Sequence, residues 1–304
     1  MKLFGFIIIT YNRPAELLDL LTSICALEKK EEFLEEVIIV NNKSTVDYSS
    51  VQELIDKNLQ VPIKYIVANE NLGVSKGRNF AIQQSTAPIL LVVDDDTTIQ
   101  TKDCFEKLEQ FFYAKNSDRE TAIVSFKVLY EETKLIQKNA FPHKCFHAYK
   151  NKSFFETYYY PGCAHAIKKE VLNKTGFYPD DFFYGMEEYD LSYRILNEGY
   201  SISYTNSIVL HHKESPLGRS PKKEKLQMLW VNKSKVAWRY LPKIYFYSTS
   251  FLWSLYFLRK TNFDFISFIK IWKTILKIPQ TENRKLINED SLAYLKKVNA
   301  RLSY

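Results

Sequence analysis

The stretch Ile89-Leu90-Leu91-Val92-Val93-Asp94-Asp95-Asp96 joins five apolar residues to three adjacent carboxylates. A short, partly β-branched apolar run of this kind indicates a strand that is buried on both faces. Neighbouring carboxylates repel one another, and a hard divalent cation would neutralise them through the oxygen ligands that it prefers. The alternative is a solvated loop in which Asp96 caps the next helix. Because the triplet ends a buried strand, we expect it to bind Mg²⁺ or Mn²⁺.

Strands and helices alternate ahead of this stretch. Apolar periodicity predicts strands at 4–9, 36–40, 63–67 and 88–93, and helices at 14–27, 50–57 and 74–84. This order is typical of an α/β fold with a Rossmann-like, mostly parallel sheet covered by helices. Such sheets bind ligands beyond the carboxyl ends of their strands. Polar residues stand at all four of these ends, in Thr10-Tyr11-Asn12-Arg13, Asn41-Asn42, Asn69-Glu70-Asn71 and the acidic triplet.

The pattern is less regular beyond residue 118. Residues 122–128 and 202–212 are predicted as strands, and 187–198 as a helix closed by Gly199. Residues 131–160 have no clear period and are rich in lysine, histidine and aromatic residues. This composition favours a long loop over the site.

Glycines and basic residues surround the start of the helix predicted at 74–84. The stretch runs Asn71-Leu72-Gly73-Val74-Ser75-Lys76-Gly77-Arg78. Its glycines permit close backbone approach, the helix start offers free N–H groups, and Lys76 and Arg78 add positive charge, which together suit a phosphate or diphosphate. The alternative is a plain helix start with a solvated basic face, because the stretch is neither a P-loop nor a dinucleotide fingerprint.

A second acidic cluster, Glu187-Glu188-Tyr189-Asp190, opens the helix predicted at 187–198. Helical spacing places Glu187, Asp190 and Arg194 on one face, with Asp190 and Arg194 as an i,i+4 pair and Glu188 directed elsewhere. A carboxylate in a closed site can act as a general base. Acidic residues also suit a helix start for electrostatic reasons alone.

Two histidines, His211 and His212, end the strand predicted at 202–212. Adjacent residues of a strand face opposite ways, so we expect one of the two to enter the site. A neutral imidazole there would be a suitable metal ligand. A purely structural histidine is the alternative.

Taken together, these motifs resemble the family 2 glycosyltransferases of the GT-A fold over about the first two-thirds of the chain. The matching motifs occur in order as Thr10-Tyr11-Asn12-Arg13, Val40-Asn41-Asn42, Asn71-Leu72-Gly73 through Gly77-Arg78-Asn79, Asp94-Asp95-Asp96, Gly162-Cys163-Ala164, Gly176-Phe177 through Glu187-Glu188-Tyr189-Asp190 to Arg194, and Gly199-Tyr200 through His212. The resemblance implies inverting transfer from a nucleotide-diphosphate sugar, by default a UDP-sugar. A dTDP-sugar such as rhamnose is the nearest rival, because thymine and uracil present the same pairing edge.

The resemblance also implies the donor-binding residues. Thr10, Tyr11, Asn12 and Arg13 would line the base and ribose pocket. Asn41 stands where the family usually has an aspartate that pairs with uracil. Asn71, Gly73, Lys76 and Arg78 would lie along the diphosphate, and Asp94 or Asp95 near the ribose and sugar.

Metal and catalytic roles follow from the same resemblance. Asp94 to Asp96 match the Asp-x-Asp motif, so Asp96, together with Asp94, would hold Mn²⁺ or Mg²⁺. His212 fits the family's metal histidine better than His211. Glu188 takes the place of the catalytic aspartate and would remove the acceptor proton, with Glu187 and Asp190 beside it.

The net charge of +7 hides an uneven distribution along the 304 residues. Up to His212 there are 23 basic and 29 acidic residues, a balance of −6, whereas the rest carries 19 basic and 6 acidic residues, a balance of +13. We therefore expect a catalytic domain at 1–215 and a basic, aromatic-rich helical extension at 216–304. The basic residues of the extension alternate with apolar faces, so nucleic acid is the poorer partner.

The extension could contact a membrane. Residues 262–278 predict an amphipathic helix with Phe265, Phe268, Ile269, Trp272, Ile275 and Leu276 on one face and Lys270, Lys273 and Lys277 on another. The apolar run at 244–258 is shorter than the ~20 residues of a spanning helix. A membrane interface fits a lipid-linked or glycan acceptor in surface polysaccharide assembly. Packing of this face on the catalytic domain is the alternative.

Cysteine usage and the N-terminal run favour a cytosolic chain, with possible peripheral contact at the inner face of the cell membrane. The four cysteines, Cys25, Cys104, Cys145 and Cys163, lie too far apart for a zinc ribbon or a Cys-x-x-Cys redox motif. The apolar run 3–9 leads into Thr10 to Pro14 and not into a cleavage site, which favours a strand over a signal peptide.

Two other functions compete with transfer. A non-catalytic nucleotide-sugar or glycan binder of the same fold is disfavoured by the complete set of Asp94–Asp96, Glu188 and His212. A nucleotidyltransferase that makes sugar nucleotides is expected to carry a glycine-rich basic loop after the first strand, and Thr10 to Pro14 is not one.

Overall fold

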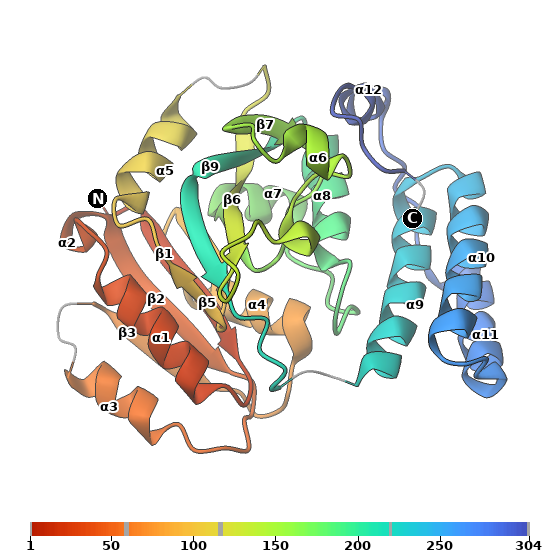
Figure 1. Cartoon of the computed structure of the whole chain (residues 1–304). Helices are drawn as coiled ribbons and strands as arrows, with labels where there is room; N and C mark the ends of the chain where they lie inside the picture. Colours follow the sequence, from red (N-terminus) through yellow and green to blue (C-terminus); the bar gives the residue numbers. More distant parts are fainter. Residues whose placement is uncertain (1, 58–60, 115–117, 219–220, 303–304) are drawn as a thin grey trace.

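The computed structural model describes residues 2–57, 61–114, 118–218 and 221–302. Figure 1 shows a twisted sheet with helices packed around it and a group of C-terminal helices at one side. The predicted α/β fold with a C-terminal helical region is confirmed. Residues 219–220 and 303–304 of the predicted extension lie outside the described residues.

The first four long strands form a parallel array in the order β3-β2-β1-β4. They are β1 (Phe4–Thr10), β2 (Leu34–Asn41), β3 (Ile63–Val67) and β4 (Ile89–Asp94). Helices α1 (Pro14–Cys25), α3 (Ser49–Lys57) and α4 (Gly73–Gln84) connect them, and the short α2 (Lys30–Phe33) precedes β2. Every strand and helix predicted before residue 94 is present, so the polar residues that follow the strands gather at one edge of the sheet.

The sheet becomes mixed beyond β4. Strand β8 (Ala164–Lys168) lies antiparallel between β4 and β6 (Thr121–Tyr130), and β9 (Ser201–His212) runs parallel to β6. The short strands β5 (Thr97–Ile99) and β7 (Phe154–Thr157) pair antiparallel with β9. Helices α5 (Cys104–Tyr113), α7 (Lys169–Thr175) and α8 (Glu187–Asn197) pack around this half. The α8 helix ends as predicted, with Gly199 in the left-handed region at φ 83°.

Apolar side chains fill both faces of the parallel strands. Along β1, Phe4, Phe6 and Ile8 enter one core, whereas Ile7 enters the core on the opposite face. This alternation is the consequence of the strand's two-residue period. A strand buried on both faces has an almost continuous apolar sequence, which explains why these strands are recognisable without the structure.

Most of the predicted long loop at 131–160 has no regular secondary structure, as expected, but three short elements interrupt it. The segment contains the 3₁₀ helix η1 (Lys138–Ala140), the short helix α6 (Phe146–Tyr149) and β7. It packs through an aromatic cluster in which Phe141 and Phe155 contact Tyr204 of β9. Its irregularly spaced aromatic residues fill this small core, and for that reason they follow no helical or strand period.

Four helices make up the described part of the C-terminal region. They are α9 (Lys222–Tyr240), α10 (Lys243–Lys260), α11 (Phe265–Thr281) and α12 (Glu289–Lys297). Val236 and Tyr240 of α9 and Tyr294 of α12 belong to a core that also covers the sheet. The region is therefore packed onto the body of the molecule.

A separate apolar core lies among α9, α10 and α11. Trp230 is fully buried there and contacts Phe257, Phe268 and Trp272, with Ile275 in the same cluster. Phe268, Trp272 and Ile275 belong to the predicted amphipathic face of residues 262–278. The predicted alternative is packing of this face on the catalytic domain, but these three residues pack against α9, which belongs to the extension.

Candidate active site

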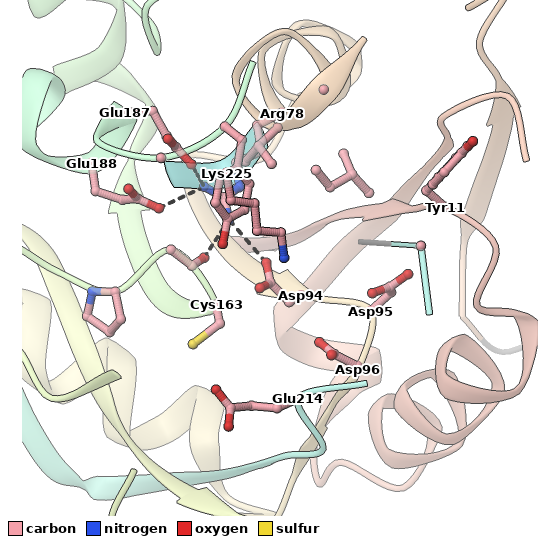
Figure 2. A pocket seen from close by; sticks show the side chains of 18 of the residues that line it. Tyr11, Arg78, Asp94, Asp95, Asp96, Cys163, Glu187, Glu188, Glu214 and Lys225 are labelled. Carbon is pink, nitrogen blue, oxygen red and sulfur yellow. Dashed lines mark hydrogen bonds and ion pairs between the residues drawn. The ribbon is translucent and has the colours of Figure 1, made fainter. Parts of the chain in front are cut away.

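A cavity of about 800 Å³ lies at the carboxyl ends of β1 and β4, where α4, α8, α9 and η1 also contribute lining residues. Figure 2 shows its acidic side chains converging from separate elements. Most of the residues that the sequence proposes for the site line this cavity. They are Thr10, Tyr11, Asn12, Arg13, Asn71, Gly73, Arg78, Asp94, Asp95, Asp96, Glu187, Glu188 and His212.

Three proposed site residues do not line the cavity. Asn41 Nδ2 donates to the Tyr65 hydroxyl at 2.7 Å, and its Oδ1 accepts from the backbone of Ser44 at 2.8 Å. Lys76 is exposed on the outer side of α4. The α4 start therefore contributes backbone and small residues to the cavity, and the predicted phosphate contact of Lys76 is not supported.

The third of these residues, Asp190, forms ion pairs with arginines outside the cavity. Its carboxylate is 2% exposed and pairs with Arg194 at 3.0 Å, as the helical spacing predicts, and with Arg239 of α9 at 2.8 Å. These contacts join α8 to the C-terminal helices and hold Asp190 away from the cavity. Glu187 does not share this face, because the first turn of α8 directs it toward the cavity together with Glu188.

Arg78 connects the two acidic clusters. Its NH1 donates to Glu188 Oε1 at 3.2 Å, and its NH2 donates to Asp94 Oδ1 at 3.1 Å and to the carbonyl of Gly162 at 3.0 Å. Glu187 Oε1 lies 3.6 Å from the same guanidinium. Burial alone would lower the pKa of Arg78, but Asp94 and the neighbouring acids outweigh it and raise the pKa. Arg78, which the sequence predicts as a phosphate ligand, therefore holds the carboxylates of Asp94 and Glu188 in place.

Gly162 makes this arrangement possible. A Cβ atom at this position would lie 2.0 Å from Glu188 Oε1 and 2.7 Å from Arg78 NH2. No side chain can be accommodated at such distances without moving one of the two partners. The segment between β7 and β8 therefore passes the ion pair so closely that a side chain at residue 162 would displace Glu188 or Arg78.

The two glutamates differ in environment although they are neighbours. The side chain of Glu187 is 4% exposed and that of Glu188 is 16% exposed. Burial, followed by the negative charge of Glu188, raises the pKa of Glu187 well above its usual range. Its Oε2 is buried without a protein hydrogen-bond partner. Glu188 is thus the more accessible carboxylate of the pair, and Glu187 is the one that favours the neutral form.

Asp94, Asp96 and His212 could hold a metal ion together. One ligand atom from each lies within 4.8 Å of the others. His212 Nε2 is 3.1 Å from Asp96 Oδ1, and its Nδ1 is 2.9 Å from Gln137 Oε1, which orients the ring. Two carboxylates and an imidazole whose other nitrogen contacts Gln137 suit Mn²⁺ or Mg²⁺. His211 faces away and contacts Glu131 at 3.1 Å, so His212 is the histidine at the site.

The loop after β1 is fixed by a segment that follows β9. Arg13 NH1 pairs with Asp95 at 2.7 Å, and its Nε donates to the carbonyl of Leu217 at 2.7 Å. The backbone N–H of Ser215 donates to Asp96 at 2.9 Å. Residues 213–218 therefore cross the acidic triplet, and Glu214 faces the cavity near Asp96 (Figure 2).

The loop after β2 supports the same region from the other side. The Tyr48 hydroxyl contacts Thr10 Oγ1 at 2.7 Å and accepts from the backbone of Arg13 at 2.9 Å. Asn12 adopts the left-handed conformation with φ 58° and accepts from the backbone of Thr45 at 2.8 Å. The predicted donor-binding residues are consequently held by several hydrogen bonds.

Several cavity residues are missed by sequence reasoning. Asn42 lines the cavity in place of Asn41; its Nδ2 donates to the carbonyl of Gly73 at 3.0 Å and its Oδ1 is buried without a protein partner. Lys225 and Leu229 enter from α9, and Figure 2 shows the Lys225 side chain extended into the cavity. Alternation along a strand predicts that only one of Asn41 and Asn42 faces the cavity, but it does not indicate which one. No local signal points to α9, because its approach depends on tertiary packing.

Comparisons with known proteins assign the chain to a family. Residues 6–176, more than half of the chain, match the model of glycosyl transferase family 2. The chain belongs to this family, and it is a glycosyltransferase of the GT-A fold. An uncharacterized protein of Haemophilus influenzae strain Rd is 26% identical over 181 residues, which cover 59% of this chain and 94% of that protein.

Solved structures share the fold at low sequence identity. The mannosyltransferase PcManGT from Pyrobaculum calidifontis, in complex with GDP-Man and Mn²⁺, has a TM-score of 0.61 at 16% identity, over 97% of this chain and 78% of that chain. TarS 1-349 from S. aureus, in complex with UDP-GlcNAc, has a TM-score of 0.61 at 16% identity, over 96% of this chain and 83% of that chain.

Proposed function

We propose that the protein transfers a sugar, with inversion at the anomeric carbon, from a nucleotide-diphosphate donor to a hydroxyl of a glycan or lipid-linked acceptor in surface polysaccharide assembly. One observation carries the proposal. The metal-ligand group of Asp94, Asp96 and His212 and the carboxylate of Glu188 open into one cavity, and Arg78 bridges Asp94 to Glu188. Inverting transfer needs a charge-stabilising site and a base on opposite sides of the same sugar.

The donor occupies the part of the cavity bounded by the loop after β1 and the start of α4 in this proposal. Thr10 to Arg13 contact the base and ribose, and the backbone around Gly73 contacts the diphosphate. Lys225 supplies positive charge from the opposite wall. The donor is a UDP-sugar or, as the alternative, a dTDP-sugar. The bound GDP-Man and UDP-GlcNAc in the two similar structures support a nucleotide sugar without determining its base.

Mn²⁺ or Mg²⁺ is the proposed cofactor, with Asp96, Asp94 and His212 as its ligands. When bound, the cation stabilises the negative charge that develops on the departing diphosphate. Gln137 fixes the ring orientation of His212 through Nδ1, so that Nε2 faces Asp96. The protein thereby keeps one imidazole nitrogen directed at the site.

Glu188 is the proposed general base. The acceptor oxygen forms a bond to the anomeric carbon as the bond from that carbon to the diphosphate oxygen breaks, and Glu188 takes the acceptor proton. Arg78 fixes one oxygen of Glu188. Glu187 is more deeply buried and its pKa is raised, so it is the poorer candidate for removing a proton at neutral pH. A neutral Glu187 also reduces repulsion beside the base.

A donor panel tests the proposed reaction. The full chain is incubated with UDP-, dTDP- and GDP-sugars in the presence of Mn²⁺ or Mg²⁺ and with glycan or lipid-linked acceptors, and the released nucleoside diphosphate and the product are measured. We expect one nucleotide class to give a product whose anomeric configuration by NMR is opposite to that of the donor. Retention of configuration would contradict the mechanism. Saturable donor binding with no turnover on any acceptor would support the non-catalytic alternative.

A further inference from the structure

The outer surface of α10 and α11 carries an unusual concentration of apolar side chains. Eighteen large hydrophobic residues are exposed in the part of the chain that the structure describes, and eleven of them lie between 244 and 276. The other seven are spread over the remaining sequence. Exposed apolar residues are ordinary when scattered, but a contiguous group marks an interaction site.

These side chains are not needed to pack the helices together. The inner faces of α10 and α11 already bury Phe246, Phe257, Ile271 and Ile275 against α9. On the outer face of α10, Phe251 is 57% exposed although it is as apolar as the buried residues. A helix with apolar side chains on every face is expected to pack against other apolar surfaces on every face.

The exposed residues of α10, α11 and the turn between them form one surface, which we call the α10–α11 surface. Figure 1 shows both helices on the side of α9 that is remote from the sheet, so the catalytic body does not cover them. The exposed apolar members are Ile244, Tyr247, Phe251, Leu252, Leu255, Tyr256, Phe263, Phe265, Ile266, Ile269 and Leu276.

The charges of the same surface have one predominant sign. Residues 243–278 contain six basic residues and one acidic residue. The acidic residue, Asp264, accepts a hydrogen bond from the backbone of Ser267 at the start of α11 and pairs with Lys223, so its negative charge is already balanced. The basic residues are all exposed, namely Lys243, Arg259, Lys260, Lys270, Lys273 and Lys277.

We propose that the α10–α11 surface docks the protein on an anionic lipid bilayer. Apolar and aromatic side chains would enter the headgroup region while lysines and arginines contact the anionic lipids, the combination that interfacial helices use. No helix among the described residues has the length and apolar character to cross a bilayer.

A bilayer accounts for the charge better than a second copy of the chain. A symmetric dimer through this surface would bring the same basic residues together from both subunits, which is repulsive. A nucleic acid would match the charge but would leave the exposed Ile266 and Phe251 without an apolar partner. An anionic bilayer is the partner that satisfies both properties.

The α9 helix links this surface to the cavity. Lys225 and Leu229 line the cavity, and the adjacent Trp230 lies beneath α10 and α11. Docking would therefore hold the cavity at a fixed height above the lipid, where a lipid-linked hydroxyl could reach it. The binding itself does not depend on transfer, so it is testable whether or not the proposed reaction is correct.

Vesicle co-sedimentation of the full chain tests the proposal. Vesicles of phosphatidylcholine alone are compared with vesicles that also contain phosphatidylglycerol, at low and high salt. We expect pelleting with the anionic vesicles that weakens at high salt. Two variants should each weaken binding by at least about tenfold. Phe251→Ser with Ile266→Ser removes apolar side chains that would enter the headgroup region. Lys270→Glu with Lys273→Glu and Lys277→Glu reverses charges, and each basic residue near an anionic surface contributes on the order of a fivefold change in affinity.

Matched controls are available elsewhere on the surface. Tyr113→Ser with Leu135→Ser removes equally exposed apolar residues, and Lys57→Glu with Lys102→Glu reverses exposed charges, and both should bind like the parent. Circular dichroism and thermal midpoints establish that every variant is folded. Absence of pelleting by the parent, equal binding to neutral vesicles, or unchanged binding by both surface variants would overturn the proposal. A concentration-dependent dimer in light scattering that Phe251→Ser with Ile266→Ser abolishes, without vesicle binding, would establish self-association instead.

Discussion

Arg78 holds Glu188 and Asp94 at once, with distances of 3.2 Å and 3.1 Å from its two terminal nitrogens. Glu188 lies in the first turn of α8 and Asp94 ends β4, so one buried guanidinium couples the proposed base to the proposed metal site. A change in either acid is therefore expected to alter the position of the other.

Gly162→Ala tests how tightly this arrangement is packed. The new Cβ would lie 2.0 Å from Glu188 Oε1, so either the carboxylate or the backbone must move. A displacement of about 1 Å at a reacting group lowers catalysis by about 100-fold. We expect kcat to fall by that order while the thermal midpoint changes by a few degrees. Near-parent turnover would show that the Arg78–Glu188 contact does not position the base.

The choice of His212 over His211 gives a second prediction. His212→Ala removes a ligand from the group formed with Asp94 and Asp96, so activation by Mn²⁺ should require at least about tenfold more metal. His211→Ala is the matched control, because that imidazole faces Glu131. The metal dependence of donor binding, measured by calorimetry, separates the two variants. Equal effects would contradict the assignment.

Asp190→Asn should affect stability more than catalysis. Its carboxylate accepts from Arg194 and Arg239, and the loss of charge-assisted hydrogen bonds costs about 1.5–3 kcal/mol. We expect urea unfolding to show that loss with KM for the donor unchanged. Asp118→Asn, at a 95% exposed side chain, should change the free energy of unfolding by less than about 0.5 kcal/mol. A selective loss of kcat in the Asp190 variant would instead support a catalytic role.

His165 predicts a loss of stability in acid. It is fully buried and its Nε2 contacts the Tyr178 hydroxyl at 3.0 Å. Burial, followed by the nearby charge of Arg78, lowers the pKa of His165 well below 6.5. The unfolded chain therefore binds a proton that the folded chain does not, and the free energy of unfolding should fall by up to about 1.4 kcal/mol per pH unit as the pH drops below about 6.5. Urea unfolding at pH 7 and pH 5.5 measures this, and His165→Gln should flatten the slope. An unchanged slope in that variant would exclude His165 as its source.

The sequence is most informative where structure is local. The strands up to β4 and their helices have clear apolar periods, so their positions and the shared edge of polar residues could be predicted. Strand β8 has only five residues, Ala164–Lys168, with a histidine and a lysine among them. Its insertion between β4 and β6 depends on pairing with residues at least 40 positions away, so no local sequence pattern predicts it.

The candidate site shows the same limit at the level of single residues. Asp190 resembles its acidic neighbours Glu187 and Glu188 in sequence, and its structural role depends on Arg239, which lies 49 positions further along. Asn41 and Asn42 are chemically equivalent in sequence, and only the direction of the last residues of β2 shows which of them lines the cavity. Lys225 enters the cavity because α9 packs on the body of the molecule.

Glu188→Gln provides the most direct test of the account. Glutamine keeps the shape of the side chain and can still contact Arg78, but it cannot take the acceptor proton. Glu198→Gln, at the end of α8 and outside the cavity, is the control. We predict that donor binding with Mn²⁺ stays within about threefold of the parent while kcat falls by at least about 100-fold, the range expected for loss of a general base. Near-normal turnover by Glu188→Gln would contradict the proposed mechanism.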